Sequence, residues 1–260
     1  YHGSTQGALS LWGTETQKQA FRPLLPGIRF IDFNVADQLE QITTKTAAVV
    51  LETIQGGAGF IVPESDYLKK VKARCEAVGA LLILDEIQPG FGRTGPFFAF
   101  EHYGISPDIL VMGKGMGGGL PVGAFSSSKT LMTLLEDHPK LGHITTFGGN
   151  PVIAAASLAT LKELRDGPHL KEIEEKEILF RKLLKHPKIE RIQGKGLMLA
   201  PILSRPELAD QVILECLNQG LILFWLLWEK RALRISPPLN ISKNEIEEGC
   251  DILRRVLDQL

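Results

Sequence analysis

The chain has 260 residues, enough for one large domain or two smaller ones with a sizeable hydrophobic core. Its 29 basic and 30 acidic residues leave a formal net charge of −1, so it has no overall basic field for binding nucleic acid or an anionic membrane surface. A hydrophobic content of 44% and a charged content of 23% exclude an intrinsically disordered chain.

Cysteine spacing and hydropathy exclude further classes. Cys75, Cys216 and Cys250 lie far apart and form no CxxC or Cys/His pattern, so we expect neither a disulfide framework nor a metal site. The longest apolar run, Leu221–Trp228, is far shorter than the ~20 residues that span a bilayer. We therefore expect a cytoplasmic protein without membrane contact. Because the chain starts at Tyr1 inside a segment that resembles the middle of a domain, we also expect that an N-terminal portion is missing.

Three short apolar runs in the first part of the chain predict buried strands. They cover residues 47–51, 81–84 and 109–112, and a helical pattern from about Ser65 to Val78 separates the first two. Continuous apolar strands that alternate with helices are typical of a parallel sheet covered on both faces. The fold class that we predict is therefore α/β, with a mostly parallel sheet.

Each of these runs ends in a polar or charged residue, namely Glu52, Asp85 and Lys114. In open α/β sheets, ligands bind beyond the carboxyl ends of the strands, so the two acids and the amine could converge on one ligand. The alternative is that they are ordinary solvated loop residues.

The hydrophobic pattern changes in the second part of the chain, where it predicts longer helices and shorter strands. Four helices are predicted at 153–164, 170–184, 207–218 and 245–257. Four strands are predicted at 189–192, 197–202, 221–225 and 233–235. We predict a large domain over residues 1–152 and a smaller α+β domain over 153–260, connected by the first of these helices.

The glycine-rich segment around Lys114 is the strongest indication of a functional site in the sequence. Glycines allow a planar ligand to approach closely, and a desolvated lysine is a nucleophile able to form a Schiff base. Gly113, Gly115 and Gly118 also match GxGxxG, which would suggest dinucleotide binding. That interpretation requires a helix starting on the glycines, whereas residues 120–125 have an extended pattern.

Three other residues have both a functional and a structural interpretation. Asp85 could hold a protonated ring nitrogen or cap a turn. Thr146 lies just before a predicted helix, where it could bind phosphate or form a simple turn. Arg234 lies between apolar residues, where it could pair with a substrate carboxylate or with a structural acid.

Taken together, five segments resemble the class III aminotransferases, which are fold-type I pyridoxal-phosphate (PLP) enzymes. The segments are residues 1–7, 85–95, 112–123, 143–151 and 234–239. They occur in the family's order, and the resemblance is strongest to the acetylornithine and ornithine aminotransferase group. It implies the fold-type I architecture, with a large PLP-binding domain and a small C-terminal domain.

The resemblance also implies roles for five residues around the cofactor. Lys114 would carry PLP and move a proton, and Asp85 would bind the pyridinium nitrogen. Gln88 would bond the ring's phenolic oxygen. Ile87 and Tyr1 would cover the two faces of the ring.

Further implied residues concern the substrate and a second subunit. Thr146 would reach the PLP phosphate of the neighbouring subunit, which implies a homodimer. Glu52 would lie near the substrate, and Arg234 would bind a substrate carboxylate. One departure from the pattern is Gly57, where ornithine, acetylornithine and 4-aminobutyrate aminotransferases usually have a glutamate that pairs with the arginine. A second is that the family's phosphate-binding loop would lie upstream of Tyr1.

From this resemblance we expect a PLP-dependent transaminase that moves an amino group from an amino acid or ω-amine donor to an oxo-acid such as 2-oxoglutarate, by a ping-pong mechanism. An aminomutase or a decarboxylase is an alternative with the same Lys114 and Asp85. A non-catalytic protein that keeps the fold is a second alternative, and a dehydrogenase would rest only on the glycine pattern.

Overall fold

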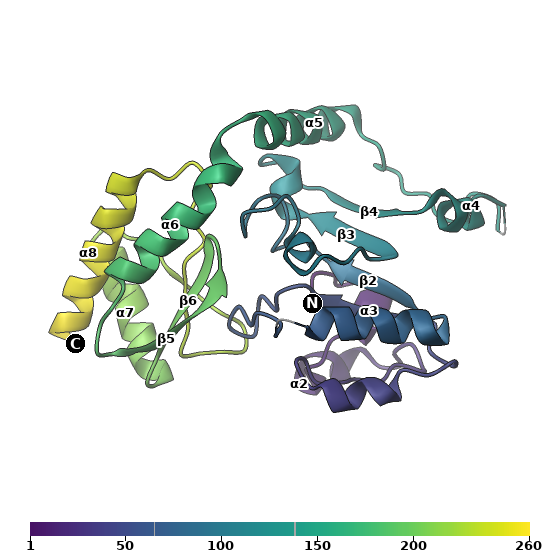
Figure 1. Ribbon diagram of the computed structural model, residues 1–260, viewed down its shortest axis with the longest axis horizontal. Coiled ribbons are helices and arrows are strands. Elements are labelled where there is room, and N and C mark those ends of the chain that lie inside the picture. Colours follow the sequence, from purple (N-terminus) through teal and green to yellow (C-terminus); the bar gives the residue numbers. More distant parts are fainter. Residues whose placement is uncertain (65, 138) are drawn as a thin grey trace.

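The structure, a computed structural model, describes residues 1–64, 66–137 and 139–260. Within these residues a four-stranded sheet forms one half of the molecule, and two small sheets with three helices form the other (Figure 1). We call them the large-sheet half and the small-sheet half. The large sheet has the order β1-β2-β3-β4. Its strands are β1 Ala48–Glu52, β2 Leu81–Asp85, β3 Ile109–Gly113 and β4 Gly123–Ser127.

The three strands predicted from apolar runs are present and parallel, whereas β4 pairs antiparallel with β3. The register pairs Glu52 directly with Asp85 across β1 and β2. In-register parallel strands end at one edge, so the polar residues that follow the apolar runs lie together at the carboxyl edge of the sheet.

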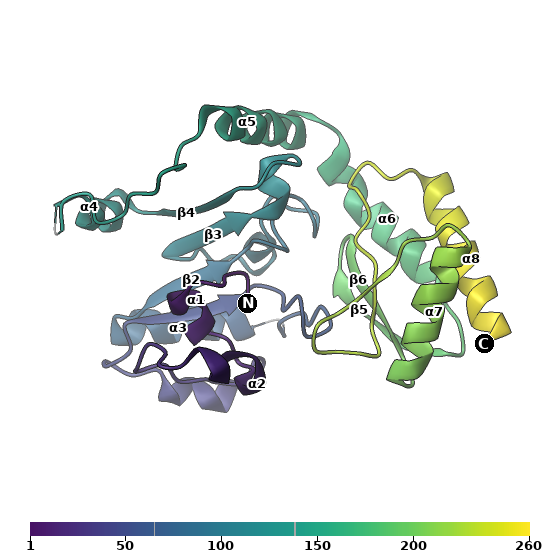
Figure 2. The ribbon, with the colours of Figure 1, turned by 180° about the vertical axis from the view of Figure 1, so that it is seen from behind.

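One helix, α3 (Tyr67–Val78), covers the sheet and packs its apolar face into a buried core with Leu82 and Leu84 of β2. It ends at Gly79, whose φ of 76° is the left-handed conformation that commonly terminates helices. The expected start near Ser65 lies outside the described residues. Figure 2 shows the two N-terminal helices on this half of the molecule. The shorter helices here are α1 Gln6–Ser10, α2 Glu15–Lys18, and the 3-10 turns η1 Gln19–Phe21, η2 Ala36–Gln41, η3 Ala99–Tyr103 and η4 Lys114–Gly117.

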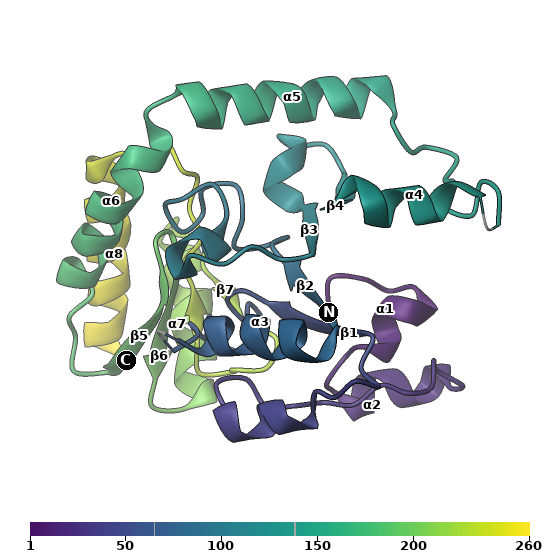
Figure 3. The same cartoon turned by 45° about the vertical axis from the view of Figure 1, so that its right-hand side comes forward.

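Two helices, α4 (Lys129–Asp137) and α5 (Pro151–Asp166), extend beyond the sheet, and α5 lies over the large-sheet half, contacts η4 and leads into the small-sheet half (Figures 1 and 3). Asn150 caps α5, because its side-chain oxygen accepts hydrogen bonds from the N–H groups of Val152 and Ile153 at 3.0 and 3.3 Å. The predicted helix at 153–164 is confirmed within these bounds.

The small-sheet half has a core made by helix faces against the β5–β6 hairpin. Its helices are α6 His169–Leu183, α7 Pro206–Asn218 and α8 Lys243–Gln259. Its strands are β5 Ile189–Lys195, β6 Met198–Leu203, β7 Phe224–Trp225 and β8 Leu233–Arg234. The strand predicted at 221–225 is shorter than expected, because the N–H of Leu221 instead bonds the Cys216 carbonyl at the end of α7.

A third buried cluster contains residues from both halves. Ile54, Phe60 and Ala99 of the large-sheet half pack with Met198 and Ile202 of β6. The two halves therefore have a common core in addition to the α5 connection, and the division into domains at residues 152 and 153 stays a prediction. Across the described residues, no helix is both long and apolar enough to cross a membrane.

Candidate active site

The carboxyl edge of the large sheet brings the three strand-end residues together. Glu52 and Asp85 end neighbouring strands in register, and Lys114 opens the 3-10 turn directly after β3. The backbone of Lys114 has a positive φ of 41°, which costs a non-glycine residue on the order of 1–3 kcal/mol. Strain of this kind is found most often at functional sites, and here it lies at the lysine singled out by the sequence.

His2 connects Asp85 with Lys114. Its Nδ1 atom lies 2.9 Å from Asp85 Oδ2, and its Nε2 atom lies 2.5 Å from Lys114 Nζ. An ionised carboxylate only accepts hydrogen bonds, which assigns the imidazole proton to Nδ1 and leaves Nε2 to accept from the lysine. The side chains of His2 and Asp85 are only 6% and 15% exposed, so this chain of contacts is largely protected from water. The sequence did not identify His2 as a site residue.

The ammonium group of Lys114 is easier to deprotonate than that of an ordinary lysine. Burial lowers its pKa, and the positive charge of Arg234 lowers it further, while Asp85 and Glu52 act in the opposite direction. A lysine with a lowered pKa is present as the free amine more often, and the free amine is the nucleophilic form. Arg234 of β8 is therefore near enough to influence this edge of the sheet.

Tyr1 lies next to the lysine. Its ring centroid is 5.7 Å from Lys114 Nζ, and its hydroxyl donates a 2.9 Å hydrogen bond to Gln88 Oε1. Burial raises the pKa of the Tyr1 hydroxyl, and the negative charges of Glu52 and Asp85 raise it further, so the phenol stays neutral and remains a donor. Tyr1 thus contacts both Lys114 and Gln88, and the roles that the resemblance implies for Tyr1 and Gln88 stay predictions.

Ile87 lies on the same edge. A Cβ atom built on Gly113, the residue before Lys114, would be 3.4 Å from Ile87 Cγ2. The N–H of Ile87 also donates to Asp85 Oδ1 at 2.9 Å, which orients the carboxylate through its second oxygen. Asp85 is therefore held by His2 on one oxygen and by the backbone on the other.

Glu52 lies next to Asp85 and accepts a hydrogen bond from the N–H of Gly56 at 2.5 Å. Burial raises its pKa, and the negative charge of Asp85 contributes to the same shift, while the bond from Gly56 opposes it. Glu52 therefore holds a proton more readily than an exposed glutamate.

Glu86 is a second buried acid that the sequence did not identify. Its carboxylate accepts hydrogen bonds from the Thr53 hydroxyl at 2.6 Å and from the N–H groups of Ala99 and Phe100 at 2.9 Å each. Burial raises its pKa to about 7 despite these bonds. Glu86 holds the 3-10 turn η3 against the sheet directly behind Asp85. Only its position after Asp85 could have suggested this role from the sequence.

Arg234 and Thr146 have different surroundings. Arg234 is half-buried, its guanidinium carbon lies 4.8 Å above the Phe224 ring, and no carboxylate in the described part of the chain forms an ion pair with it. This leaves the guanidinium available for an external carboxylate. Thr146 is exposed on the segment between α4 and α5, and within the residues that the structure describes no hydrogen bond joins it to the other candidates.

Gly57 lies under the ring of Trp228. A Cβ atom at Gly57 would be 2.6 Å from a Trp228 ring carbon, and the backbone N–H of Trp228 donates a hydrogen bond to the Gly57 carbonyl at 2.9 Å. The Trp228 ring also packs edge-on against Tyr1, with centroids 5.1 Å apart at 85°. The indole therefore fills the space beside Gly57, where the family pattern usually has a glutamate side chain.

Comparison with known proteins identifies the family of the chain. The family model for class III aminotransferases matches residues 1–257. An acetylornithine aminotransferase of Caldanaerobacter subterraneus subsp. tengcongensis is 36% identical over 100% of this chain and 66% of its own length. A putrescine aminotransferase of Pectobacterium atrosepticum is 38% identical over 98% of this chain and 58% of its own length. The chain thus spans 58–66% of the length of these relatives.

Solved structures show the same similarity. An ornithine aminotransferase of Toxoplasma gondii, described with partial occupancy of PLP at its active site, has a TM-score of 0.92 and 31% identity over 100% of this chain and 62% of its own. An N-acetylornithine aminotransferase of Stenotrophomonas maltophilia has a TM-score of 0.77 and 32% identity over 89% and 62% of the two chains. The match along nearly the whole chain and the agreement in fold lead to one conclusion: the chain belongs to the class III aminotransferase family and has its fold-type I architecture.

Proposed function

We propose that the protein is a PLP-dependent aminotransferase that transfers an amino group from an amino acid or ω-amine donor to an oxo-acid such as 2-oxoglutarate, in ping-pong order. The observation that carries this proposal is the connected set Lys114–His2–Asp85, in which an amine of lowered pKa is linked through an imidazole to a carboxylate. Retention of this set favours an enzyme over a non-catalytic protein with the same fold.

The side chains at the carboxyl edge match the functional groups of PLP. Lys114 offers an amine for the aldehyde carbon, and Asp85 offers a carboxylate for the pyridinium nitrogen. Gln88 offers an amide for the phenolic oxygen, while Tyr1 and Ile87 offer an aromatic and an aliphatic surface beside the lysine. When bound, PLP supplies an electron sink for negative charge at the substrate Cα.

The protein's own residues then have distinct tasks. Lys114 Nζ, with its lowered pKa, would take the proton from the Cα of the amino donor in the first half-reaction and would give a proton to the Cα of the new amino acid in the second. His2 and the Ile87 N–H keep Asp85 oriented. Arg234, which lacks an acidic partner in the described chain, binds the carboxylate of the oxo-acid in a bidentate manner.

The donor side of the site is less polar than in relatives with a glutamate at the position of Gly57. Here Trp228 covers Gly57 and packs on Tyr1, so an aromatic surface replaces a carboxylate. This supports a donor with a neutral carbon chain near Trp228. The likeness to a putrescine aminotransferase is the reason that we keep ω-amines among the donors.

We also propose a homodimer, supported by an exposed apolar surface on the segment from α4 to α5. Ile144, Phe147 and Val152 are 71%, 79% and 67% exposed on this segment, which extends away from both halves (Figure 3). Thr146 lies within the same stretch, where it would reach the cofactor phosphate of the second subunit. The cytoplasmic location stays a prediction.

The decisive experiment is reduction of the full-length, PLP-supplied protein with borohydride, followed by peptide mass spectrometry. We expect the cofactor adduct on Lys114 in the unaltered protein, and loss of multiple turnover in Lys114→Ala. Lys129→Ala, which removes a lysine at the start of α4, is the matched control and keeps both adduct and turnover. An adduct on another lysine, or multiple turnover by Lys114→Ala, would refute the assignment. Release of CO₂, or product without an oxo-acid acceptor, would indicate a decarboxylase or an aminomutase instead.

A further inference from the structure

Trp228 enters the site from the small-sheet half, on the loop between β7 and β8. Leu226, two residues earlier, is buried in the cluster that contains residues of both halves. After Trp228, the carboxylate of Glu229 accepts hydrogen bonds from the guanidinium of Arg231 at 2.8 and 3.0 Å. The backbone N–H of Trp228 itself donates to the Gly57 carbonyl at 2.9 Å. The loop is therefore held before, at and after Trp228, and it brings the indole to the carboxyl edge of the large sheet.

Two consecutive glycines make room for the indole and for Tyr1. A Cβ atom on Gly57 would lie 2.6 and 2.7 Å from two carbons of the Trp228 ring. A Cβ atom on Gly56 would lie 3.0 Å from the Tyr1 hydroxyl oxygen and would overlap Gln88 Oε1. Neither glycine has a positive φ, so the close approach of these side chains, rather than the backbone conformation, requires glycine here.

The Tyr1 ring is held by a hydrogen bond and by two aromatic neighbours, which restrict different motions. Its hydroxyl oxygen, which lies on the long axis of the ring, donates to Gln88 at 2.9 Å, and this bond leaves rotation about that axis free. Two rings restrict the rotation, His2 at 4.2 Å and 33° and Trp228 at 5.1 Å and 85° between centroids and planes. Because the two rings meet Tyr1 at different angles, together they favour a single orientation of it.

The contact between Trp228 and Tyr1 is not required to join the two halves. The third buried cluster contains side chains from both of them. In addition, Arg93 Nη1 of the large-sheet half donates to the carbonyls of Leu197 at 3.2 Å and Pro237 at 2.5 Å. Removing the indole leaves these contacts in place, so its effect on the site can be separated from its effect on the fold.

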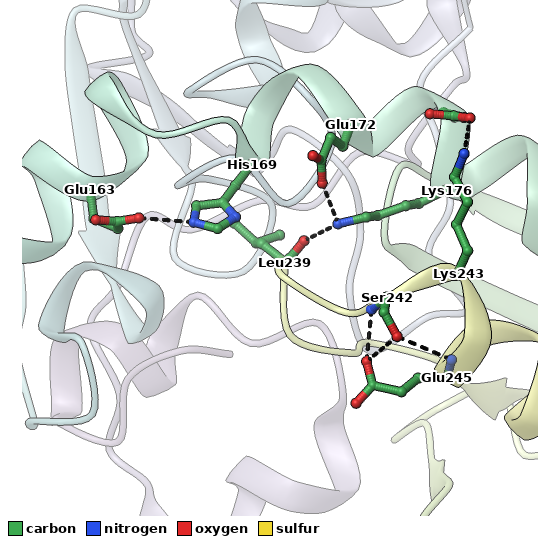
Figure 4. Close-up of polar contacts among 9 residues, drawn as sticks. Glu163, His169, Glu172, Lys176, Leu239, Ser242, Lys243 and Glu245 are labelled. Carbon is green, nitrogen blue, oxygen red and sulfur yellow. Dashed lines mark hydrogen bonds and ion pairs between the residues drawn. The ribbon is translucent and has the colours of Figure 1, made fainter.

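The small-sheet half also has buried polar contacts of its own. Lys176 of α6 is 5% exposed, and its Nζ atom donates to the Leu239 carbonyl at 2.8 Å and pairs with Glu172 at 2.9 Å (Figure 4). Lys176 and both partners belong to the small-sheet half. A variant of Lys176 therefore loses stability without a change at Tyr1, which makes it a suitable control.

We propose that Trp228 is a positioning residue that fixes the rotation of the Tyr1 ring beside Lys114, and through it the orientation in which the cofactor ring is held. The proposal rests on the function proposed above, because it takes Tyr1 as a surface that covers the PLP ring. The Tyr1 centroid lies 5.7 Å from Lys114 Nζ, so a rotation of the ring changes the surface next to the group that carries the cofactor. In Trp228→Leu the Tyr1 ring has several rotations of similar energy, and the cofactor is held less tightly and in more than one orientation.

The test measures the bound cofactor rather than turnover. The full-length protein is saturated with PLP, and circular dichroism in the visible band of the cofactor is measured per bound PLP, together with the Kd for PLP. A chromophore held in one asymmetric orientation gives a strong signal, whereas averaging over orientations weakens it. For the loss of one aromatic pair in Trp228→Leu, we expect the signal to fall to about half or less and the Kd to rise about three- to tenfold. Trp228→Phe, which keeps an aromatic ring, should retain most of the signal and of the affinity.

A double-mutant cycle shows whether Trp228 acts through Tyr1. Tyr1→Leu removes the ring that Trp228 holds, so adding Trp228→Leu to it should change the Kd by less than about twofold. An increase in Kd that is as large in the Tyr1→Leu background as in the unaltered background would overturn the proposal, because Trp228 would then act on the site by another route.

Two controls separate positioning from a general loss of stability. Lys176→Met removes the buried cation of Figure 4, and Trp225→Leu removes a tryptophan of the same half whose indole bonds Asp210 at 2.6 Å. Both should lower the free energy of unfolding and keep the signal and the Kd within about twofold. The proposal is overturned if Trp228→Leu keeps the signal per bound cofactor, or if either control loses it to the same degree.

A second perturbation covers the case in which Trp228→Leu does not fold. Gly57→Ala displaces the indole without removing it, and an unchanged signal in Gly57→Ala also overturns the proposal. If the Lys114 adduct forms and Trp228→Leu keeps the signal, only this proposal fails. If the unaltered protein forms no adduct, the proposed function fails together with it.

Discussion

The contact between His2 and Asp85 leads to a sharp prediction, because two amide side chains can imitate the two imidazole nitrogens separately. Asparagine at position 2 places an N–H donor where Nδ1 lies, 2.9 Å from Asp85 Oδ2. Glutamine places its amide where Nε2 lies, near Lys114 Nζ, and leaves the carboxylate without this donor. The two variants are similar in polarity, so a difference between them reports on the bond to Asp85.

The magnitude follows from the kind of bond. A hydrogen bond to a charged group contributes about 1.5–3 kcal/mol, and Asp85 is only 15% exposed, so water replaces the donor poorly. A loss of about 2 kcal/mol in the orientation of Asp85 corresponds to a factor of about 30 in the dissociation constant of PLP. We expect this loss in His2→Gln and less than a threefold change in His2→Asn.

The assay is a spectrophotometric titration of the apo-protein with PLP, followed by urea unfolding to confirm that both variants fold. Equal PLP affinity in His2→Gln and the unaltered protein would refute the reasoning. Equal weakening in both variants would show that the ring itself, rather than the Nδ1 donor, is what the site requires.

Two further predictions concern stability. Burial raises the pKa of Glu86 to about 7, above the usual range of a glutamate, so between the ordinary pKa and this one the folded chain binds more protons than the unfolded chain. The free energy of unfolding therefore falls by about 3 kcal/mol as pH rises through this window. Urea unfolding at pH 5 and pH 8 should show a smaller difference in the free energy of unfolding for Glu86→Gln than for the unaltered protein. An equal difference in the two proteins would contradict the assignment of this pH dependence to Glu86. Gly57→Ala should destabilise by about 1–3 kcal/mol, because its Cβ would lie 2.6 Å from the Trp228 ring. Gly123→Ala, which has nothing within 4 Å of its Cβ, is the control, and equal melting temperatures for the two variants would disprove the clash.

Much of the fold could be predicted because its strands are buried on both faces. Such strands consist of continuous apolar residues, and β1, β2 and β3 follow those runs to within a residue or two. For the antiparallel strand β4 the sequence showed only an extended pattern at 120–125, because Gly-Ala-Phe-Ser-Ser has neither a continuous apolar run nor a clear alternation. The predicted strand at 221–225 failed at its start, where a helix C-terminus uses the backbone N–H of Leu221.

The convergence of Lys114 and Asp85 at one edge of the sheet could be predicted, because both follow apolar runs that form parallel strands, whereas their roles stay predictions. His2, Glu86 and Arg93 were missed for a common reason. Their importance lies in partners that are 83, 14 and 144 residues away along the chain. No local pattern encodes such contacts, since they arise only when segments distant in sequence come together in the fold.

The buried cluster that joins β6 to Ile54, Phe60 and Ala99 has a consequence for protein engineering. Exchanging residues 153–260 for the corresponding part of a relative would replace Met198, Ala200 and Ile202 while keeping the side chains that they pack against. The shared cluster would then contain side chains from two different proteins, and differences in side-chain volume there create cavities or clashes. A functional chimera therefore has to carry residues 54, 60 and 99 together with the C-terminal segment.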